Sequence, residues 1–323
     1  MEYGDLGDVN RFRSTDHYEP VVRDGVSWPQ PRDESRGSSQ PSVRKEPSAI
    51  SRKRCVLPRR VSLFGLFCRP WAMWWKWLLL ANSVACAVLL FAGVRLPSRS
   101  LVSLGTLLGV LAVPSAMTCL FAEWDVSRRT SVLRIVCAVI AGVVVELVAG
   151  VLNNAFHIIN GCISWAAVVE EPLMAVIVLV FALKGRKTEN ILTGLSLGCA
   201  VGAGFSTMET MEYVYGYGKE ALPSIDVLMF RTLLAPFMHM SWTGAFGGAV
   251  WDANGAESGW RIVLGRPMVY LVLVGMILCH AVWNTAWFYV PLAALSWVVL
   301  LTYVRKGIRQ VFERGLVAEE FWE

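Results

Sequence analysis

The sequence predicts an all-α, polytopic helical membrane protein with about eight transmembrane helices. Hydrophobic residues make up 55% of its 323 residues and charged residues only 17%, whereas a soluble protein carries about 25% charge. The apolar residues also come in blocks of about 20, the length of helix that spans a hydrocarbon layer of ~30 Å. These observations exclude a soluble enzyme, a secreted disulfide scaffold and a disordered chain.

The N-terminal segment differs from the rest of the chain. Residues 1–60 are polar, rich in Ser, Pro and charge, and without apolar periodicity, so we expect a disordered cytoplasmic tail. Between Val43 and Arg60 this tail carries seven Lys or Arg and one acidic residue. Such a stretch is attracted to an anionic leaflet by ~1 kcal/mol per cation. We therefore divide the chain into the tail, a membrane domain over 61–305 and a short cytoplasmic C-terminal tail over 306–323.

The apolar blocks place the predicted spans at 74–94, 102–122, 132–152, 162–183, 191–209, 227–249, 268–287 and 289–304. The loops after the second, fourth and sixth spans, with the C-terminal tail, carry twelve Lys or Arg, and the other loops carry three. Because positive residues stay in the cytoplasm, we expect a multi-pass protein of the cell membrane with both termini cytoplasmic. The net charge of +5 lies at the membrane boundaries, so no nucleic-acid partner is expected.

Ionisable side chains inside the predicted spans are the candidates for function, because each costs a few kcal/mol in a bilayer. They are Glu146, Glu170, Glu171, Glu209, Arg231, His239 and His280. With the predicted topology, Glu170 and His280 lie ~12 Å from the outer surface and His239 ~18 Å. These ionisable groups therefore gather in the outer half of the membrane. Glu146 lies on span three, and the others lie on spans four to seven. We expect Glu146 to bond a neighbouring helix, and Arg231 either to pair with Glu209 or Glu212 or to extend its side chain to the membrane interface.

Two histidines and several carboxylates at one depth can support hydrolysis in two ways. They can bind a divalent metal such as zinc that keeps a position for water. Alternatively, a buried glutamate can act as general base on water while His and Asn polarise the carbonyl. The sequence has no HExxH pair, and no Asp falls inside a predicted span, which excludes two other intramembrane protease chemistries.

Four motifs in order carry a resemblance to a known family. They are Glu170-Glu171, the segment from Phe205 to Tyr213 with Glu209 on the same helix face, the lone His239, and His280 with Asn284 four residues later. In this order they resemble the motifs of the PrsW family of intramembrane proteases, which is related to the type II CAAX prenyl proteases. The resemblance covers about residues 74 to 305. Met174 stands where the family often has Lys, Pro172 follows the glutamates directly, and Thr210 replaces a common Asn.

The resemblance implies an intramembrane endopeptidase that cleaves membrane-anchored proteins, such as anti-sigma factors, near the outer leaflet. Glu170 or Glu171 would activate water, and Asn284 would orient the site or donate to the oxyanion. Glu209, His239 and His280 would bind a metal, zinc being one candidate, or hold the oxyanion.

Two alternatives stay open at this point. Met174 and Pro172 make a non-catalytic membrane scaffold of the same fold credible. A proton-coupled transporter also uses intramembrane Glu and His, but the cytoplasmic halves of these spans are almost wholly apolar.

Overall fold

The computed structural model describes residues 19–23, 26–30, 74–155, 165–185, 189–218, 222–254, 265–285 and 288–317. The chain forms two units, Met1–Arg54 and Cys55–Glu323. In the first unit, strands β1 (Glu19–Arg23) and β2 (Val26–Gln30) pair antiparallel, with Val21 opposite Trp28. The sequence analysis did not anticipate this hairpin. The remainder of 1–60 lies outside the described residues, so the disorder of the tail stays a prediction.

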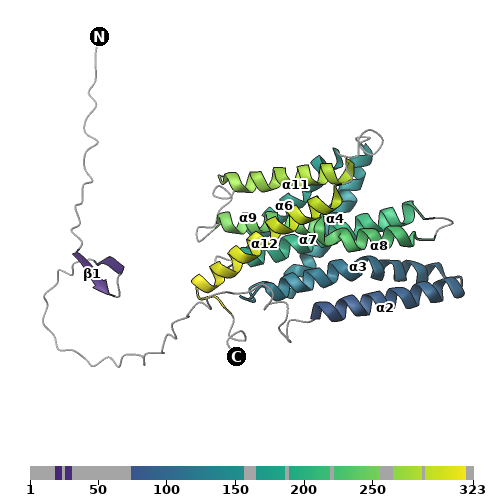
Figure 1. Cartoon of the computed structure of the whole chain (residues 1–323), viewed down its shortest axis with the longest axis horizontal. Coiled ribbons are helices and arrows are strands. Elements are labelled where there is room, and N and C mark those ends of the chain that lie inside the picture. Colours follow the sequence, from purple (N-terminus) through teal and green to yellow (C-terminus); the bar gives the residue numbers. More distant parts are fainter. Residues whose placement is uncertain are drawn as a thin grey trace, which may run out of the picture. The chain divides into compact units, whose positions relative to one another are not determined.

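The second unit is helical, as predicted. Its helices are α2 (Trp74–Arg95), α3 (Arg99–Trp124), α4 (Val132–Ala155), α6 (Ala166–Leu183), α7 (Ile191–Gly216), α8 (Ile225–Leu234), α9 (His239–Asn254), α11 (Pro267–Thr285) and α12 (Tyr289–Glu313) (Figure 1). Within the described residues, seven of them are long and apolar enough to cross a membrane, all except α8 and α9. Several helices run beyond their predicted spans, α7 and α12 by the most: α7 continues to Gly216, and α12 continues to Glu313, past the predicted boundary at 305.

The prediction of one continuous helix over 227–249 is wrong. Helix α8 ends at Leu234, a 3₁₀ turn (Ala235–Phe237) follows, and α9 begins at His239. Pro236 is the physical cause, since proline has no N–H to donate and its ring clashes with the preceding helical turn. The break puts His239 on the first turn of a new helix. There its side chain can reach other helices without the constraint of a preceding turn.

Helix α7 is the centre of the unit and packs closely on α9. In its most apolar window 94% of the α7 residues are buried, compared with 6% in α2, which leaves α2 as a lipid-facing helix. A glycine stripe explains the close contact: a Cβ added to Gly194, Gly198 or Gly202 would lie 2.2–2.5 Å from backbone oxygens of α9. The partner of Gly194 is Gly247, and that of Gly202 is His239. Small residues let helix backbones approach in this way in membranes. The α7–α9 packing therefore positions His239 directly.

Polar contacts join the ends of several helices at one end of the bundle, which we call the proximal end. They join Trp74 with Glu123, Asn190 with Ser127, Arg134 with Glu189, and Ile191 with Gln310. Helix α2 therefore begins, and α12 ends, at the same end as the start of α7. The opposite end, where α6 begins and α7 and α11 finish, is called the distal end. The capping side chain of Asn190, which accepts from the backbone N–H groups of Leu192 and Thr193, fixes the proximal start of α7.

Candidate active site

A single oxygen of Glu171 contacts both intramembrane histidines. Its Oε1 atom lies 2.9 Å from Nδ1 of His239 and 2.8 Å from Nδ1 of His280. The three side chains come from α6, α9 and α11, and all are buried. Since an ionised carboxylate oxygen only accepts hydrogen bonds, Nδ1 is the donor in both rings, and Nε2 carries the lone pair whenever a ring is neutral. Glu171 thus fixes the orientation and tautomer of two rings at once.

Two more carboxylates face the Nε2 atoms of His239 and His280. Oε2 of Glu170 lies 3.7 Å from Nε2 of His280, and Oε2 of Glu209 lies 3.4 Å from Nε2 of His239. Glu170 and Glu171 are neighbours in sequence, but their directions differ by ~100° around the axis of α6. The adjacent pair can therefore serve different atoms of the same two imidazoles.

Neighbouring helices hold these outer carboxylates in place. Asn153 of α4 donates a hydrogen bond from Nδ2 to Oε1 of Glu170 at 2.8 Å. On the other side, Arg231 of α8 contacts Oε2 of Glu209 at 2.5 Å, and its guanidinium lies 3.9 Å from the ring centroid of Tyr213. The expected pairing of Arg231 with Glu209 is confirmed. Both carboxylates therefore have defined positions rather than a choice of rotamers.

Aromatic rings enclose the histidines. The ring centroid of Phe205 lies 4.6 Å from that of His239. Trp242 stacks on His280 with centroids 5.5 Å apart, and it also meets His239 edge-on at 5.3 Å. Trp283 packs against Trp242 in turn. Apolar walls of this kind exclude water and strengthen electrostatic interactions inside the site.

The polar atoms of the site fit a metal ion. Glu170, His239 and His280 are buried, and each offers one ligand atom within 4.8 Å of the others. In the described part of the structure, Oε2 of Glu170 and Nε2 of His239 are buried without a hydrogen-bond partner. Buried polar atoms normally have a partner, and a coordinated cation would provide one for both. Zinc accepts this combination of imidazole nitrogen and carboxylate oxygen.

This grouping differs from the metal set expected from the sequence, which was Glu209, His239 and His280. The structure groups Glu170 with the histidines instead, because Glu170 reaches His280 from the first turns of α6. Glu209 lies next to His239 but is also held by Arg231.

All of these groups lie toward the distal end. Glu170 is in the second turn of α6, Glu209 is seven residues before the end of α7 at Gly216, and His280 is five residues before the end of α11 at Thr285. At 1.5 Å per residue these positions are ~6–11 Å from the helix ends. The site is thus off-centre in the bundle, as the sequence predicted for residues sharing one depth.

Two expected residues and one unexpected residue complete the surroundings. Glu146 is buried in α4 and interacts electrostatically with Glu209 and Glu170. Asn284 lies one turn beyond His280 and is partly buried. Asn153 was not among the residues predicted from the sequence, because the predicted third span ended at residue 152. Its spacing of seven residues from Glu146, two helical turns, was the available signal.

The departures from the family motif have structural explanations. Met174 is fully buried, and its sulfur accepts a hydrogen bond from Thr243 at 3.5 Å, so it packs between α6 and α9 where a lysine would bring a charge. Pro172 is the seventh residue of α6, where it leaves the carbonyl of Val168 without its helical N–H partner, yet the helix continues to Leu183. Neither residue interrupts α6 or displaces the two glutamates.

A helical, membrane-spanning fold around a buried Glu/His/His group defines an intramembrane hydrolase with a metal-binding site. The comparison with protein families agrees: the model of the PrsW family of intramembrane metalloproteases matches residues 102–305, and the chain belongs to this family. The protein is therefore a peptide hydrolase of the membrane. No curated protein and no solved structure matches the chain.

Proposed function

We propose that this protein is an endopeptidase that cleaves membrane-anchored proteins within the outer half of the cell membrane. The single observation that carries the proposal is the shared oxygen of Glu171, which orients two imidazoles toward the carboxylates of Glu170 and Glu209. Such a set has little structural value in a bilayer, where each ionisable group is costly. Catalysis on a bound substrate explains why these ionisable side chains lie together.

Glu170, His239 and His280 would hold a divalent cation such as zinc. When bound, the cation would polarise the scissile carbonyl and lower the pKa of a water molecule. Glu171 acts through the histidines, since a carboxylate on the far nitrogen of a metal-binding imidazole orients it and raises its basicity. Because Glu170 would bind the cation, it could not also act as the base. Glu209, which lies beside Nε2 of His239, would then accept the proton of the water molecule.

The same residues would also support hydrolysis without a cation. Glu170 would then be the general base, because its Oε2 atom is buried without a hydrogen-bond partner and lies 3.7 Å from Nε2 of His280. His280 and Asn284, one turn apart on α11, would polarise the carbonyl. Glu171 keeps its positioning role in both arrangements, so the two differ in what Glu170 and Glu209 do.

The outer location follows from the distribution of cations. Twelve Lys or Arg fall in the loops and tail assigned to the cytoplasm and three in the loops assigned to the outside. The joined helix ends at the proximal end support this assignment, because the flanks of α2 and α12 lie together. With the proximal end cytoplasmic, the site lies near the outer leaflet. A membrane-anchored regulator such as an anti-sigma factor is a substrate of the expected kind.

The test uses the full chain in liposomes with a model single-span substrate. Wild type should release two fragments, and His239→Ala or His280→Ala should reduce turnover by ~100-fold or more. Metal analysis of the purified protein and a chelator with zinc rescue separate the two arrangements. If all of these variants cleave normally while inserted, the protease proposal fails. If wild type is folded and binds substrate but never cleaves it, the chain is a scaffold.

A further inference from the structure

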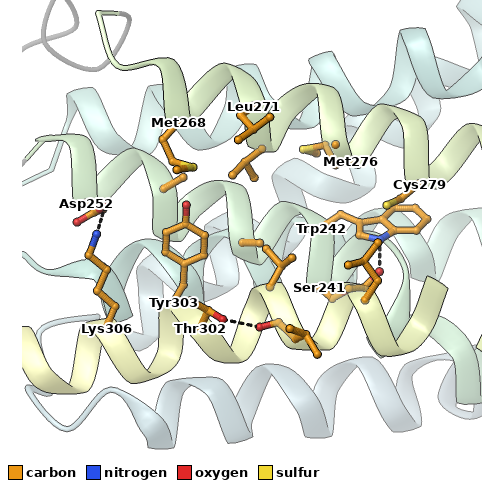
Figure 2. Close-up of a pocket in the computed structure, with 18 of the residues that line it drawn as sticks. Ser241, Trp242, Asp252, Met268, Leu271, Met276, Cys279, Thr302, Tyr303 and Lys306 are labelled. Atoms are coloured by element: carbon orange, nitrogen blue, oxygen red, sulfur yellow. Dashed lines mark hydrogen bonds and ion pairs between the residues drawn. The ribbon is translucent and has the colours of Figure 1, made fainter. Parts of the chain in front are cut away.

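A long groove lies between α9, α11 and α12, away from the catalytic atoms, and ends at Trp242 and Cys279 beside His280. It has a volume of about 920 Å³ and is lined mostly by apolar side chains. Figure 2 shows Met268, Leu271 and Met276 of α11 along one side and Thr302 and Tyr303 of α12 along the other. The groove is open at the surface: Met268 and Leu271 on its α11 side are 51% and 64% exposed. In a membrane, this opening faces lipid.

The floor of the groove is made of small residues. Ser241, Ala245 and Ala249 of α9 line it at intervals of four residues, so they form one stripe on the helix. On α11, Gly275 also lines the groove, and a Cβ added there would meet nothing within 4 Å. Small residues on a transmembrane surface allow another helix backbone to approach closely.

The two ends of the groove have different chemistry. Lys306 pairs with Asp252 at 2.6 Å at the proximal end, where Arg266 also lines the groove. At the other end lies Trp242 (Figure 2). Its indole N–H donates to Ser296, and its ring stacks on the catalytic His280. A molecule in the groove would therefore have its charged flank at the proximal end and its far end against the catalytic site.

We propose that this groove binds the transmembrane helix of the substrate and presents it lengthwise to the catalytic site. This inference rests on the proposed function. The open side admits a helix from the bilayer, and the small-residue floor lets its backbone approach. Trp242 lines the groove and stacks on His280, and this contact makes the substrate, rather than structural lipid, the occupant that the geometry favours.

The length of the groove sets the position of the cut. From Met268 to Cys279, the lining residue next to His280, α11 rises over eleven residues, or ~17 Å. A substrate helix beside α11 would cover the same distance with the same number of residues. The scissile bond should then lie about 11–14 residues from the proximal boundary of the substrate span. This places the cut in the half of the span farther from the cytoplasm.

The first experiment locates the substrate by photocrosslinking in liposomes. A photoreactive phenylalanine derivative replaces Leu271 in the groove or, as the matched control, Val136, which is exposed on α4 and does not line the groove. We expect the substrate to crosslink at position 271 at least tenfold more than at 136. Equal yields, or phospholipid alone as the product at 271, would overturn the proposal. The readout is binding, so it does not depend on whether cleavage occurs.

The second experiment fills the groove. Gly275→Trp places a large side chain in open space, so folding should be kept, and Val136→Trp is the control with equal bulk on a lipid-facing surface. Gly275→Trp should lower cleavage of the single-span substrate at least tenfold while metal content and cleavage of a short peptide around the cut stay normal. Mass spectrometry of the wild-type products should find the cut 11–14 residues from the proximal boundary. Unchanged cleavage by Gly275→Trp, or a cut at that boundary, would refute the proposal that the groove binds the substrate helix. Absence of any wild-type cleavage refutes the proposed function instead.

Discussion

Arg231 of α8 and Glu209 of α7 form an ion pair at 2.5 Å beside the histidines, and both side chains are largely buried. Removing one partner of a buried pair leaves the other charge uncompensated, which typically costs ~3–5 kcal/mol. Helix α8 is the short helix created by the break at Pro236. The ion pair therefore ties α8 to the site. The sequence had predicted α8 to be part of one longer helix over 227–249.

We expect Arg231→Met to lower thermal stability in detergent and to reduce turnover at least tenfold. Adding Glu209→Gln to that variant should restore much of the stability, because no unpaired charge remains, but not the activity. A double-mutant cycle on the melting curves should give a coupling of at least ~1 kcal/mol. Additive effects would mean that the two side chains do not interact as the structure shows.

Glu171 and Glu170 should respond differently to the same substitution. Glu171→Gln removes the shared acceptor of two Nδ1 protons, so we expect metal affinity to fall ~10–100-fold, as for other outer partners of metal-binding histidines. Glu170→Gln should reduce turnover by ~100-fold or more. Zinc titration separates the two, since added zinc should recover activity in Glu171→Gln but not in Glu170→Gln. Glu146→Gln is the control and should cost much less than either.

The glycine stripe of α7 can be tested with one added methyl group. Gly202→Ala would place a Cβ 2.4 Å from the backbone oxygen of His239, so α7 and α9 must separate. We expect a loss of ~1–3 kcal/mol of stability together with a large loss of activity. Gly216→Ala, on the same helix with nothing within 4 Å, is the matched control and should be nearly neutral. Equal melting temperatures for the two variants would show that the close contact is not needed.

The topology can be tested by cysteine labelling in intact cells. In a variant without the native cysteines, Leu222→Cys should react with a membrane-impermeant maleimide from outside, because this exposed residue lies between α7 and α8 at the distal end. Arg314→Cys, at the end of α12, should react only after the membrane is permeabilised. The reverse pattern would invert the chain and move the site to the inner leaflet.

The N-terminal tail should be dispensable for the chemistry. A chain starting near Val61 keeps every residue of the site and every helix of the second unit. We expect it to insert and to cleave the model substrate at the wild-type rate. A truncated protein that is inserted and folded, yet slow, would assign a regulatory role to the tail or to its hairpin.

The sequence by itself determined the membrane-spanning helical fold and which ionisable residues share a depth. Apolar blocks of fixed length can only be helices in a bilayer, because every backbone polar group must be satisfied within the segment. The costly residues Glu170, Glu171, His239 and His280 were identifiable for the same reason, since a charge in hydrocarbon is rare without a function.

Tertiary structure decided how those residues divide the work. Helical spacing fixes which side chains share a face of one helix, but not the rotation of one helix against another. The glycine contacts of α7 set that rotation for α9, and the break at Pro236 freed His239 to meet Glu171. The same packing brought Asn153 to Glu170 and Arg231 to Glu209, and left the groove between α11 and α12 open. These are contacts between residues distant in sequence, which depend on packing geometry rather than on local pattern.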